Sequence, residues 1–312
     1  MSDTLPLSPR PTLGFIGAGR VARALASAAT QANYDVSVVA SRNADSAQRI
    51  GAALPNCETL TVDRPEDMNA VFSRADLVFL TVPDDAIGSC AAYLAPHAGQ
   101  ALVHCSGASE VGLLAPATQH GGQIGGFHPL FLFAGLDDDA TRLSGSAITI
   151  EADTPLNEIL QRLASDIGCR ALSIPPGERM QYHAGANYAA SFLLCLLDEA
   201  THLWQAIGMS ENDAREAMWP LVIGTLNAAR ERGLSGALAG PVSRGDAGIV
   251  TRHTEALASM GGNHATLYSL LTLRAIHLAR QRTNADSTAL DAIARAVAPY
   301  IPPCSPSPES NT

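Results

Sequence analysis

Three polar residues recur at intervals of four within an apolar segment of the chain. The segment reads QYHAGANYAAS over residues 181–191, and the polar residues are His183, Asn187 and Ser191. Because residues four apart lie on the same face of a helix, this spacing predicts a single polar line. A histidine exchanges protons near neutral pH, and an asparagine donates and accepts hydrogen bonds. His183 and Asn187 are therefore candidates to protonate and orient a substrate oxygen, unless the line simply faces water.

A second candidate histidine is His128, in the segment GGFHPL over residues 125–130. The two preceding glycines would let a ligand approach the backbone closely. The alternative for His128 and His183 alike is a buried imidazole that bonds to backbone carbonyls. The sequence predicts that one of the two histidines is the proton donor of a catalytic site.

A candidate anion site lies in the segment GPVSRGD over residues 240–246. The guanidinium of Arg244 can make two parallel hydrogen bonds to a carboxylate, and Ser243 can add a third. The alternative is that Arg244 pairs with an acidic side chain such as Asp246. Asp246 itself is expected to cap the helix that begins at Ala247. His253, two turns further on, is a weaker candidate for the same cleft.

A glycine-rich motif near the start of the chain predicts a dinucleotide site. The segment GFIGAGRVA over residues 14–22 has the spacing G-x-G-x-x-A at Gly17, Gly19 and Ala22, between an apolar strand and a helix. The first glycine allows a tight turn, the second lets the backbone approach a pyrophosphate, and the alanine lets the helix pack on the strand. The cofactor-binding residues expected here are Gly17, Ala18, Gly19, Arg20 and Val21.

The ends of the following strands predict which dinucleotide is bound. NAD-binding domains usually place an acidic residue after the second strand, but this chain has Arg42 there, after Ser41. A guanidinium can pair with a 2′-phosphate, so we expect a preference for NADP(H), unless Arg42 is a solvated loop residue. Val82, Pro83 and Ser106 follow two later strands and are expected beside the cofactor, although ordinary loop packing would also explain the first two.

The elements that must position these residues fall into two regions. From residue 12 to 175, short apolar runs alternate with helical segments, which predicts a Rossmann-type doubly wound parallel sheet. The residues from 176 to 301 lack strand signals and predict an all-helical domain for substrate binding or dimerisation. The helices are expected at about 178–207, 210–231, 246–260, 263–282 and 286–298. Residues 1–11 and 302–312 are predicted to be disordered tails.

Composition narrows the class of protein further. The chain has 312 residues and a net charge of −10, which disfavours nucleic acid and anionic membranes as partners. Six scattered cysteines without metal-ligand spacing predict reduced thiols and no metal site. Neither a signal peptide nor a membrane-spanning stretch is recognisable, so a soluble cytoplasmic protein is expected. The long apolar helices of the second region favour a homodimer.

Several motifs together resemble a known superfamily. GFIGAGRVA, LTVPDDAI, HCSGA and GGFHPL, followed by a helical domain, are similar to NADP-binding β-hydroxyacid dehydrogenases, a group with ketopantoate reductases, pyrroline-5-carboxylate reductases and prephenate dehydrogenases. HCSGA, GFHPL, YHAGANYAAS and GPVSRGD resemble more closely a family of oxidoreductases that pairs a Rossmann-like domain with a helical domain of formerly unknown function. The resemblance implies ketopantoate as the best single substrate.

One departure from the superfamily bears on catalysis. β-Hydroxyacid dehydrogenases usually carry Lys-x-x-x-Asn on the corresponding helix, with lysine as general acid or base, whereas this chain has His183-x-x-x-Asn187 and contains no lysine. We therefore predict an NADPH-dependent reductase of a small carboxylate-bearing keto acid in which a histidine replaces the lysine. The alternatives are an NADP(H)-binding sensor without catalysis and an oxidoreductase that uses a deazaflavin or a metal-linked acceptor.

Overall fold

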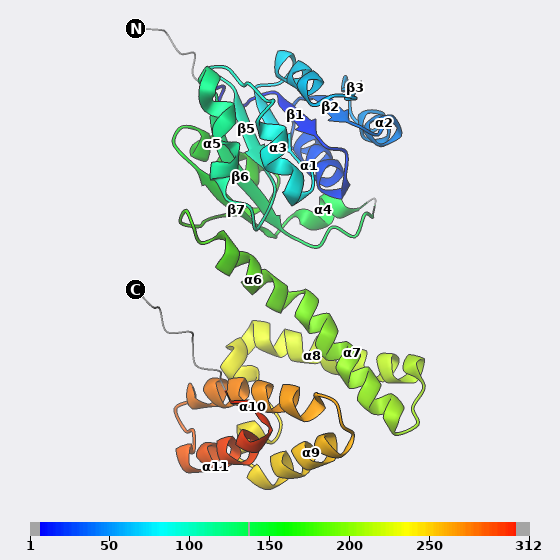
Figure 1. Ribbon diagram of the computed structural model, residues 1–312, viewed down its shortest axis with the longest axis vertical. Helices are drawn as coiled ribbons and strands as arrows, with labels where there is room; N and C mark the ends of the chain where they lie inside the picture. Colours follow the sequence, from blue (N-terminus) through cyan, green and yellow to red (C-terminus); the bar gives the residue numbers. More distant parts are fainter. Residues whose placement is uncertain (1–6, 137, 304–312) are drawn as a thin grey trace. The chain divides into compact units, whose positions relative to one another are not determined.

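The chain folds into two compact units. The computed structural model describes residues 7–136 and 138–303 (Figure 1). The first unit extends to Cys195 and contains the sheet, and the second begins at Leu196.

One eight-stranded sheet organises the first unit. The strands are β1 (Leu13–Ile16), β2 (Val36–Ser41), β3 (Glu58–Thr61), β4 (Leu77–Leu80), β5 (Ala101–His104), β6 (Gln123–Leu130), β7 (Ala147–Ala152) and β8 (Arg170–Ser173). Their order is β3-β2-β1-β4-β5-β6-β7-β8, and only β6 and β7 pair in antiparallel fashion. The chain proceeds outward from β1 in both directions, which confirms the predicted doubly wound fold.

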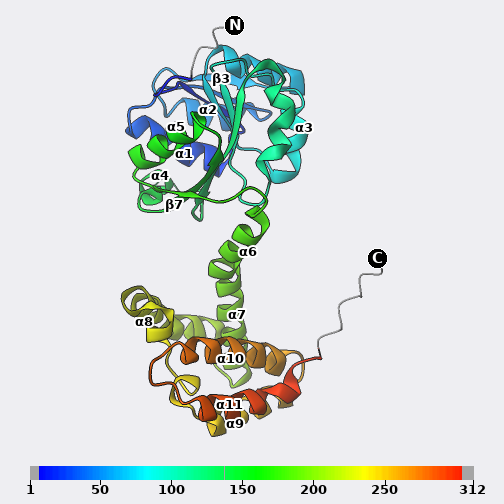
Figure 2. The same cartoon turned by 90° about the vertical axis from the view of Figure 1, so that its left-hand side faces the viewer.

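Both faces of the sheet are buried, as the apolar strands predict. Phe15 and Phe79 stack on one face, where α1 (Arg20–Gln31), α2 (Ala44–Gly51), α4 (Asp139–Leu143) and α5 (Leu156–Asp166) contribute to the same core. Ile16 and Leu80 point to the other face and pack with α3 (Ile87–Ala91) and the 3-10 helices η1 (Pro65–Ser73) and η3 (Val111–His120). Figure 2 shows α1 and α5 on one side of the sheet and α3 on the other.

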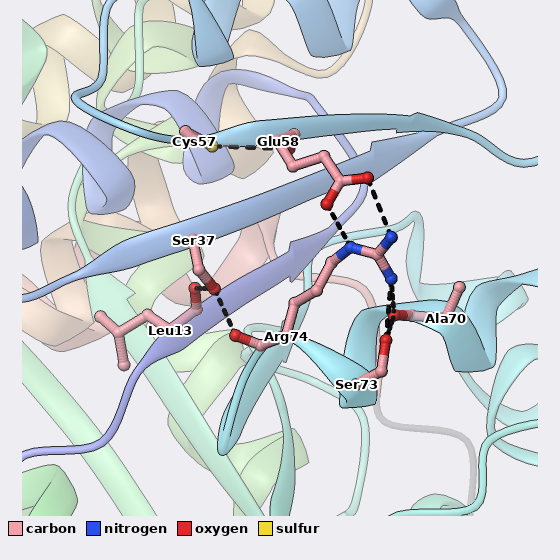
Figure 3. A network of polar contacts seen from close by, with 7 residues as sticks. All are labelled: Leu13, Ser37, Cys57, Glu58, Ala70, Ser73 and Arg74. Atoms are coloured by element: carbon pink, nitrogen blue, oxygen red, sulfur yellow. Dashed lines mark hydrogen bonds and ion pairs between the residues drawn. The ribbon is translucent and has the colours of Figure 1, made fainter.

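The edge strand β3 carries only a weak sequence signal, because its sequence ETLT is short, mostly polar and at most partly buried. A polar network holds it in place (Figure 3). The guanidinium of Arg74 forms an ion pair with Glu58 on β3 and also donates to the carbonyl of Ala70 at 2.8 Å. Ser37 on β2 donates to the carbonyl of Arg74 at 2.6 Å, which ties the same arginine to the sheet interior.

Strand β6 also carries a weak sequence signal, because QIGGFHPL contains two glycines and a proline, which are unfavourable in strands. Its position decides where His128 lies. Gly126 pairs with His104 at the end of the parallel strand β5, so His128 stands two residues beyond that end. His128 is therefore at the carboxyl edge of the sheet, where doubly wound folds bind ligands.

The region after the sheet is helical throughout its described part, which confirms the second half of the fold prediction. The helices are α6 (Arg179–Ala189), α7 (Ser191–Ala206), α8 (Glu211–Ala237), α9 (Ala247–Ser259), α10 (His264–Arg280) and α11 (Ser287–Val297). Val250, Ile276 and Ile293 form the centre of the core of the second unit. Among the described residues, no helix is long and apolar enough to cross a membrane.

The first predicted helix is divided in two. Ala190 leaves helical geometry, with φ −117° and ψ −81°, and separates α6 from α7. Ser191 consequently begins the next helix instead of continuing the line of His183 and Asn187. A helical spacing alone does not reveal such a break, because the alanines around it are good helix formers.

The domain limits differ from the predicted ones. The units divide after Cys195 and not after residue 175, because α6 packs against the sheet through Arg179. Residues 7–11 do not form a disordered tail: Leu7 is 3% exposed in the sheet core, and Arg10 donates to the carbonyl of Ala32 at 2.9 Å. Of the rest of the two predicted tails, Pro302 and Pro303 are exposed and lie in no helix or strand, and residues 1–6 and 304–312 lie outside the described residues.

Candidate functional site

The glycine motif forms a tight turn between β1 and α1. Gly17 has φ +103°, and a Cβ atom there would lie 2.5 Å from the carbonyl oxygen of Thr81, so a side chain is excluded. Gly19 caps α1 and has open space where its side chain would be. Ala22 is fully buried where the helix packs on the sheet. The turn thus leaves the helix N-terminus accessible to an anionic group.

A cavity of about 410 Å³ adjoins this turn. It collects most of the residues predicted to bind the cofactor, namely Gly17, Ala18, Gly19, Ser41, Arg42, Val82 and Pro83. Arg42 is exposed at the end of β2, and Ser41 accepts a hydrogen bond from the amide of Asn43 at 3.1 Å. Asn43 in turn caps α2 through the amide of Ser46. The lining combines small and apolar side chains with the guanidinium groups of Arg42 and Arg64 and the carboxyl group of Asp63, and a guanidinium can pair with a 2′-phosphate.

Three predicted cofactor residues do not line this cavity. Arg20 donates to the carbonyl of Phe133 at 3.3 Å, and Val21 packs against the sheet core. The hydroxyl of Ser106 accepts from the amides of Ala108 and Ser109, at 3.1 and 2.9 Å, and so shapes the loop after β5.

Two histidines meet beside that loop. The imidazoles of His128 on β6 and His183 on α6 lie 6.5 Å apart between ring centroids, at an angle of 77°. A Cβ atom at Gly107 would lie 2.8 Å from Nε2 of His128 and 3.0 Å from Cδ2 of His183. Only glycine allows the loop and both rings to come this close, which explains the residue type in HCSGA.

The histidines nearest the sheet are held neutral. Burial, reinforced by the positive charge of Arg179, lowers the pKa of His104 to about 3. Burial also lowers the pKa of His128 to about 4, with further contributions from His183 and Arg179 and an opposing one from Asp84. At neutral pH the imidazole of His128 is therefore uncharged.

Arg179 fixes the start of α6 on the sheet. Its side chain is fully buried, and Nε donates to Glu151 of β7 at 2.6 Å while Nη1 donates to the carbonyl of Ser106 at 2.9 Å. Gly126 provides the room, since a Cβ atom there would overlap Nη2 of Arg179. The same arginine therefore connects β7, the loop after β5 and the helix that carries His183 and Asn187.

A groove of about 520 Å³ runs along α6 and the end of β6. Its polar residues are His128, Tyr182, His183 and Asn187, and the segment from Pro129 to Leu132 and the alanines of α6 form the rest of the wall. His183 and Asn187 thus lie on one groove, as their spacing predicted, and His128 joins them from the sheet. The arrangement can donate hydrogen bonds to an oxygen at the edge of an apolar surface.

The predicted carboxylate site lies in the second unit. Ser243 and Arg244 belong to the 3-10 turn η4 (Val242–Arg244) and line a small cavity of about 160 Å³, which Arg282 and Asp286 also border. Arg244 is exposed. Asp246 accepts from the amide of Ile249 at 3.0 Å, which confirms its predicted role as the cap of α9. His253 forms a 2.9 Å hydrogen bond with Tyr268 of α10.

Sequence reasoning missed Tyr182, Arg179 and Gly107. Tyr182 lies next to His183 and forms a 2.9 Å hydrogen bond with Nδ1 of His128. Glu151 within the buried strand AITIEA was a usable signal for a buried cation, because a carboxylate at such a position needs a partner. Nothing in the sequence indicated that this partner is Arg179, 28 residues further along the chain.

Comparisons with known proteins agree with this architecture. Residues 4–129 match the Rossmann-like domain, and residues 146–275 match a domain of unknown function, DUF2520. The chain therefore combines a Rossmann-like domain with a DUF2520 domain. A comparison with curated proteins finds none that matches.

Solved structures share the fold at low sequence identity. Protein TM1727 of Thermotoga maritima is 22% identical, with a TM-score of 0.71 over 86% of this chain and 99% of its own. BF3122 of Bacteroides fragilis, a proposed NADP oxidoreductase, is 21% identical, with a TM-score of 0.64 over 87% and 99%. A pyrroline-5-carboxylate reductase of Coxiella burnetii is 14% identical, with a TM-score of 0.55 over 94% and 100%.

The low pKa of His128 predicts a loss of stability in mild acid. The unfolded chain protonates this histidine near pH 6.5 and the folded chain only near pH 4, so the unfolded state binds more protons between these values. The free energy of unfolding should therefore decrease as the pH falls through this window. Between pH 7 and pH 5, His128 should contribute a loss of about 2 kcal/mol.

Urea denaturation of the wild type and His128→Gln at both pH values tests this prediction. The variant should lose about 2 kcal/mol less than the wild type over this interval. Equal losses in the two proteins would contradict the proposed environment of His128.

Proposed function

We propose that the protein is an NADPH-dependent oxidoreductase that reduces a carbonyl or imine carbon of a small carboxylate-bearing compound. The observation that carries this proposal is the single groove lined by His128, His183 and Asn187 at the carboxyl edge of a Rossmann-like sheet. The glycine turn and the cavity beside Arg42 lie at the same edge, where such folds hold a dinucleotide. A 2-keto acid such as ketopantoate is the leading substrate.

The residues of the chain fit the chemistry that such a reduction requires. When bound, NADPH supplies a hydride to the substrate carbon, and negative charge develops on the substrate oxygen or nitrogen. His183 and His128 are the proposed donors of a proton or hydrogen bond to that atom, and Asn187 orients it. The resemblance pairs His183 and Asn187 with the lysine and asparagine of β-hydroxyacid dehydrogenases, and we propose that a histidine takes the role of the acid.

Substrate binding needs a cation that the groove itself does not offer. The described residues that line it include histidines and a tyrosine but no arginine. We propose Arg244 as the carboxylate anchor, with Ser243 beside it, because a guanidinium binds a carboxylate through two parallel hydrogen bonds. The exposed apolar side chains of α8, such as Leu221 and Ile223, support the further proposal of a homodimer.

Replacement of Arg42 should remove the preference for NADPH. The Arg42→Ala variant should bind NADPH about tenfold more weakly, with little change for NADH, because only NADPH carries the 2′-phosphate. Arg162→Ala is the matched control, since Arg162 is an exposed arginine on α5 that lines neither the cavity beside Arg42 nor the pocket at the glycine turn. Calorimetric titration with both cofactors measures the effect, and an unchanged affinity ratio in Arg42→Ala would contradict this assignment.

Replacement of His183 should separate catalysis from cofactor binding. In His183→Gln, turnover of the best substrate from a panel of 2-keto acids and cyclic imines should fall about 100-fold, while the Kd for NADPH stays unchanged. His202→Gln, an exposed histidine on α7, is the control. NADPH binding without turnover of any panel member by the wild type would overturn the enzymatic proposal and favour a sensor.

A further inference from the structure

The hydrogen bond between Tyr182 and His128 determines which nitrogen of the imidazole faces the groove. The phenol oxygen lies 2.9 Å from Nδ1 of His128, and the two rings are nearly perpendicular, at 86°. The Cε1–Nε2 edge of the imidazole lies against Gly107, which also adjoins Cδ2 of His183. The two nitrogens of His128 therefore have different tasks: Nδ1 contacts the protein, and Nε2 is on the side of the second histidine.

Both partners of this hydrogen bond are uncharged at neutral pH. Burial raises the pKa of Tyr182 above its ordinary value of 10.0, so its hydroxyl keeps its proton. The groups that face His128 are mostly cationic or basic: Arg179 and His183 from α6 and His104 from β5. The carboxylate of Asp84 raises the pKa of His128, against the effect of these groups, and the carboxylate of Glu151 is paired with Arg179.

A neutral imidazole has one nitrogen that donates and one that accepts. A phenol is a much stronger acid than a neutral imidazole, so the favoured arrangement between these two groups has the phenol as donor and the ring nitrogen as acceptor. We infer that Tyr182 is a positioning residue that holds His128 in the tautomer with its hydrogen on Nε2. The groove then contains a fixed, neutral N–H donor beside His183.

This inference rests on the proposed function for its catalytic consequence. During hydride addition the electron pair of the C=O or C=N bond moves to the heteroatom, and the cofactor is oxidised to NADP⁺. The Nε2–H of His128 donates a hydrogen bond to that atom without giving up its proton, because an imidazolate would be too basic a product. The proton that completes the reduced product is then delivered through His183 from solvent. The two histidines have distinct roles, and Tyr182 sets this division.

The tautomer can be observed directly in the full chain without cofactor or substrate. Two-bond ¹H–¹⁵N correlation spectra of protein labelled with ¹⁵N-histidine distinguish protonated from unprotonated ring nitrogens, and His128→Gln assigns the signal. At pH 7 the wild type should show protonated Nε2 and unprotonated Nδ1 at His128. In Tyr182→Phe the ratio of the Nε2–H tautomer of His128 to its Nδ1–H tautomer should decrease about tenfold, as expected for the loss of one hydrogen bond.

Tyr188→Phe is the matched control, because Tyr188 is an exposed tyrosine on the same helix. Its spectrum at His128 should equal that of the wild type. A wild type with the hydrogen on Nδ1, or a Tyr182→Phe variant with unchanged tautomers, would overturn the inference. If the Tyr182→Phe variant does not fold, the wild-type spectrum alone still shows which nitrogen of His128 carries the hydrogen.

Activity measurements separate this inference from the proposed function. Tyr182→Phe should lower kcat about tenfold and leave the Kd for NADPH unchanged, as expected for the loss of one oriented hydrogen bond. A shifted tautomer with unchanged kcat would overturn the catalytic role of the Nε2–H donor. A wild type that fails to bind NADPH would contradict the proposed function, while the spectrum of the free protein would still report on the tautomer.

Discussion

The candidate site depends on one buried ion pair, between Arg179 and Glu151. The guanidinium is fully buried and holds β7 through Glu151 and the loop after β5 through the carbonyl of Ser106. Breaking such a pair is costly, because either partner would be left as an unpaired charge in the protein interior. Since Arg179 is also the first residue of α6, this cost keeps the helix in a fixed position. The positions of Tyr182, His183 and Asn187 relative to the sheet follow from it.

The same cation determines the electrostatics of the site. The chain is strongly acidic overall, yet the interior near His128 contains a buried arginine and two further histidines. Burial and these neighbours both disfavour a second positive charge, so His128 and His104 remain neutral. A neutral imidazole is a poor acid but a good hydrogen-bond donor, which suits stabilisation of a developing anion. An acid for the final proton must come from another group, and His183 lies next to it.

Local sequence patterns were sufficient to predict the parts of the fold that depend on interactions between residues close together in the sequence. The apolar strands, the turn at Gly17 and Gly19, and the cap at Asp246 each require particular residue types within a few positions. The spacing of His183 and Asn187 likewise predicted their common groove. The strands β3 and β6 carry no clear local pattern, because their stability comes from neighbours distant in the sequence, such as Arg74 for β3. The roles of Arg179, Tyr182 and Gly107 depend on strand order and on packing across the sheet, which one sequence does not encode in any local pattern.

The central claim is that the groove of His128 and His183 receives the nicotinamide end of a bound NADP(H). A crystal structure of the chain with NADP⁺ bound tests this claim most directly. We expect the pyrophosphate to contact the turn at Gly19, the 2′-phosphate to contact Arg42, and C4 of the nicotinamide to face the two imidazoles. A nicotinamide that lies away from both histidines would contradict this placement, whatever the affinity for the cofactor.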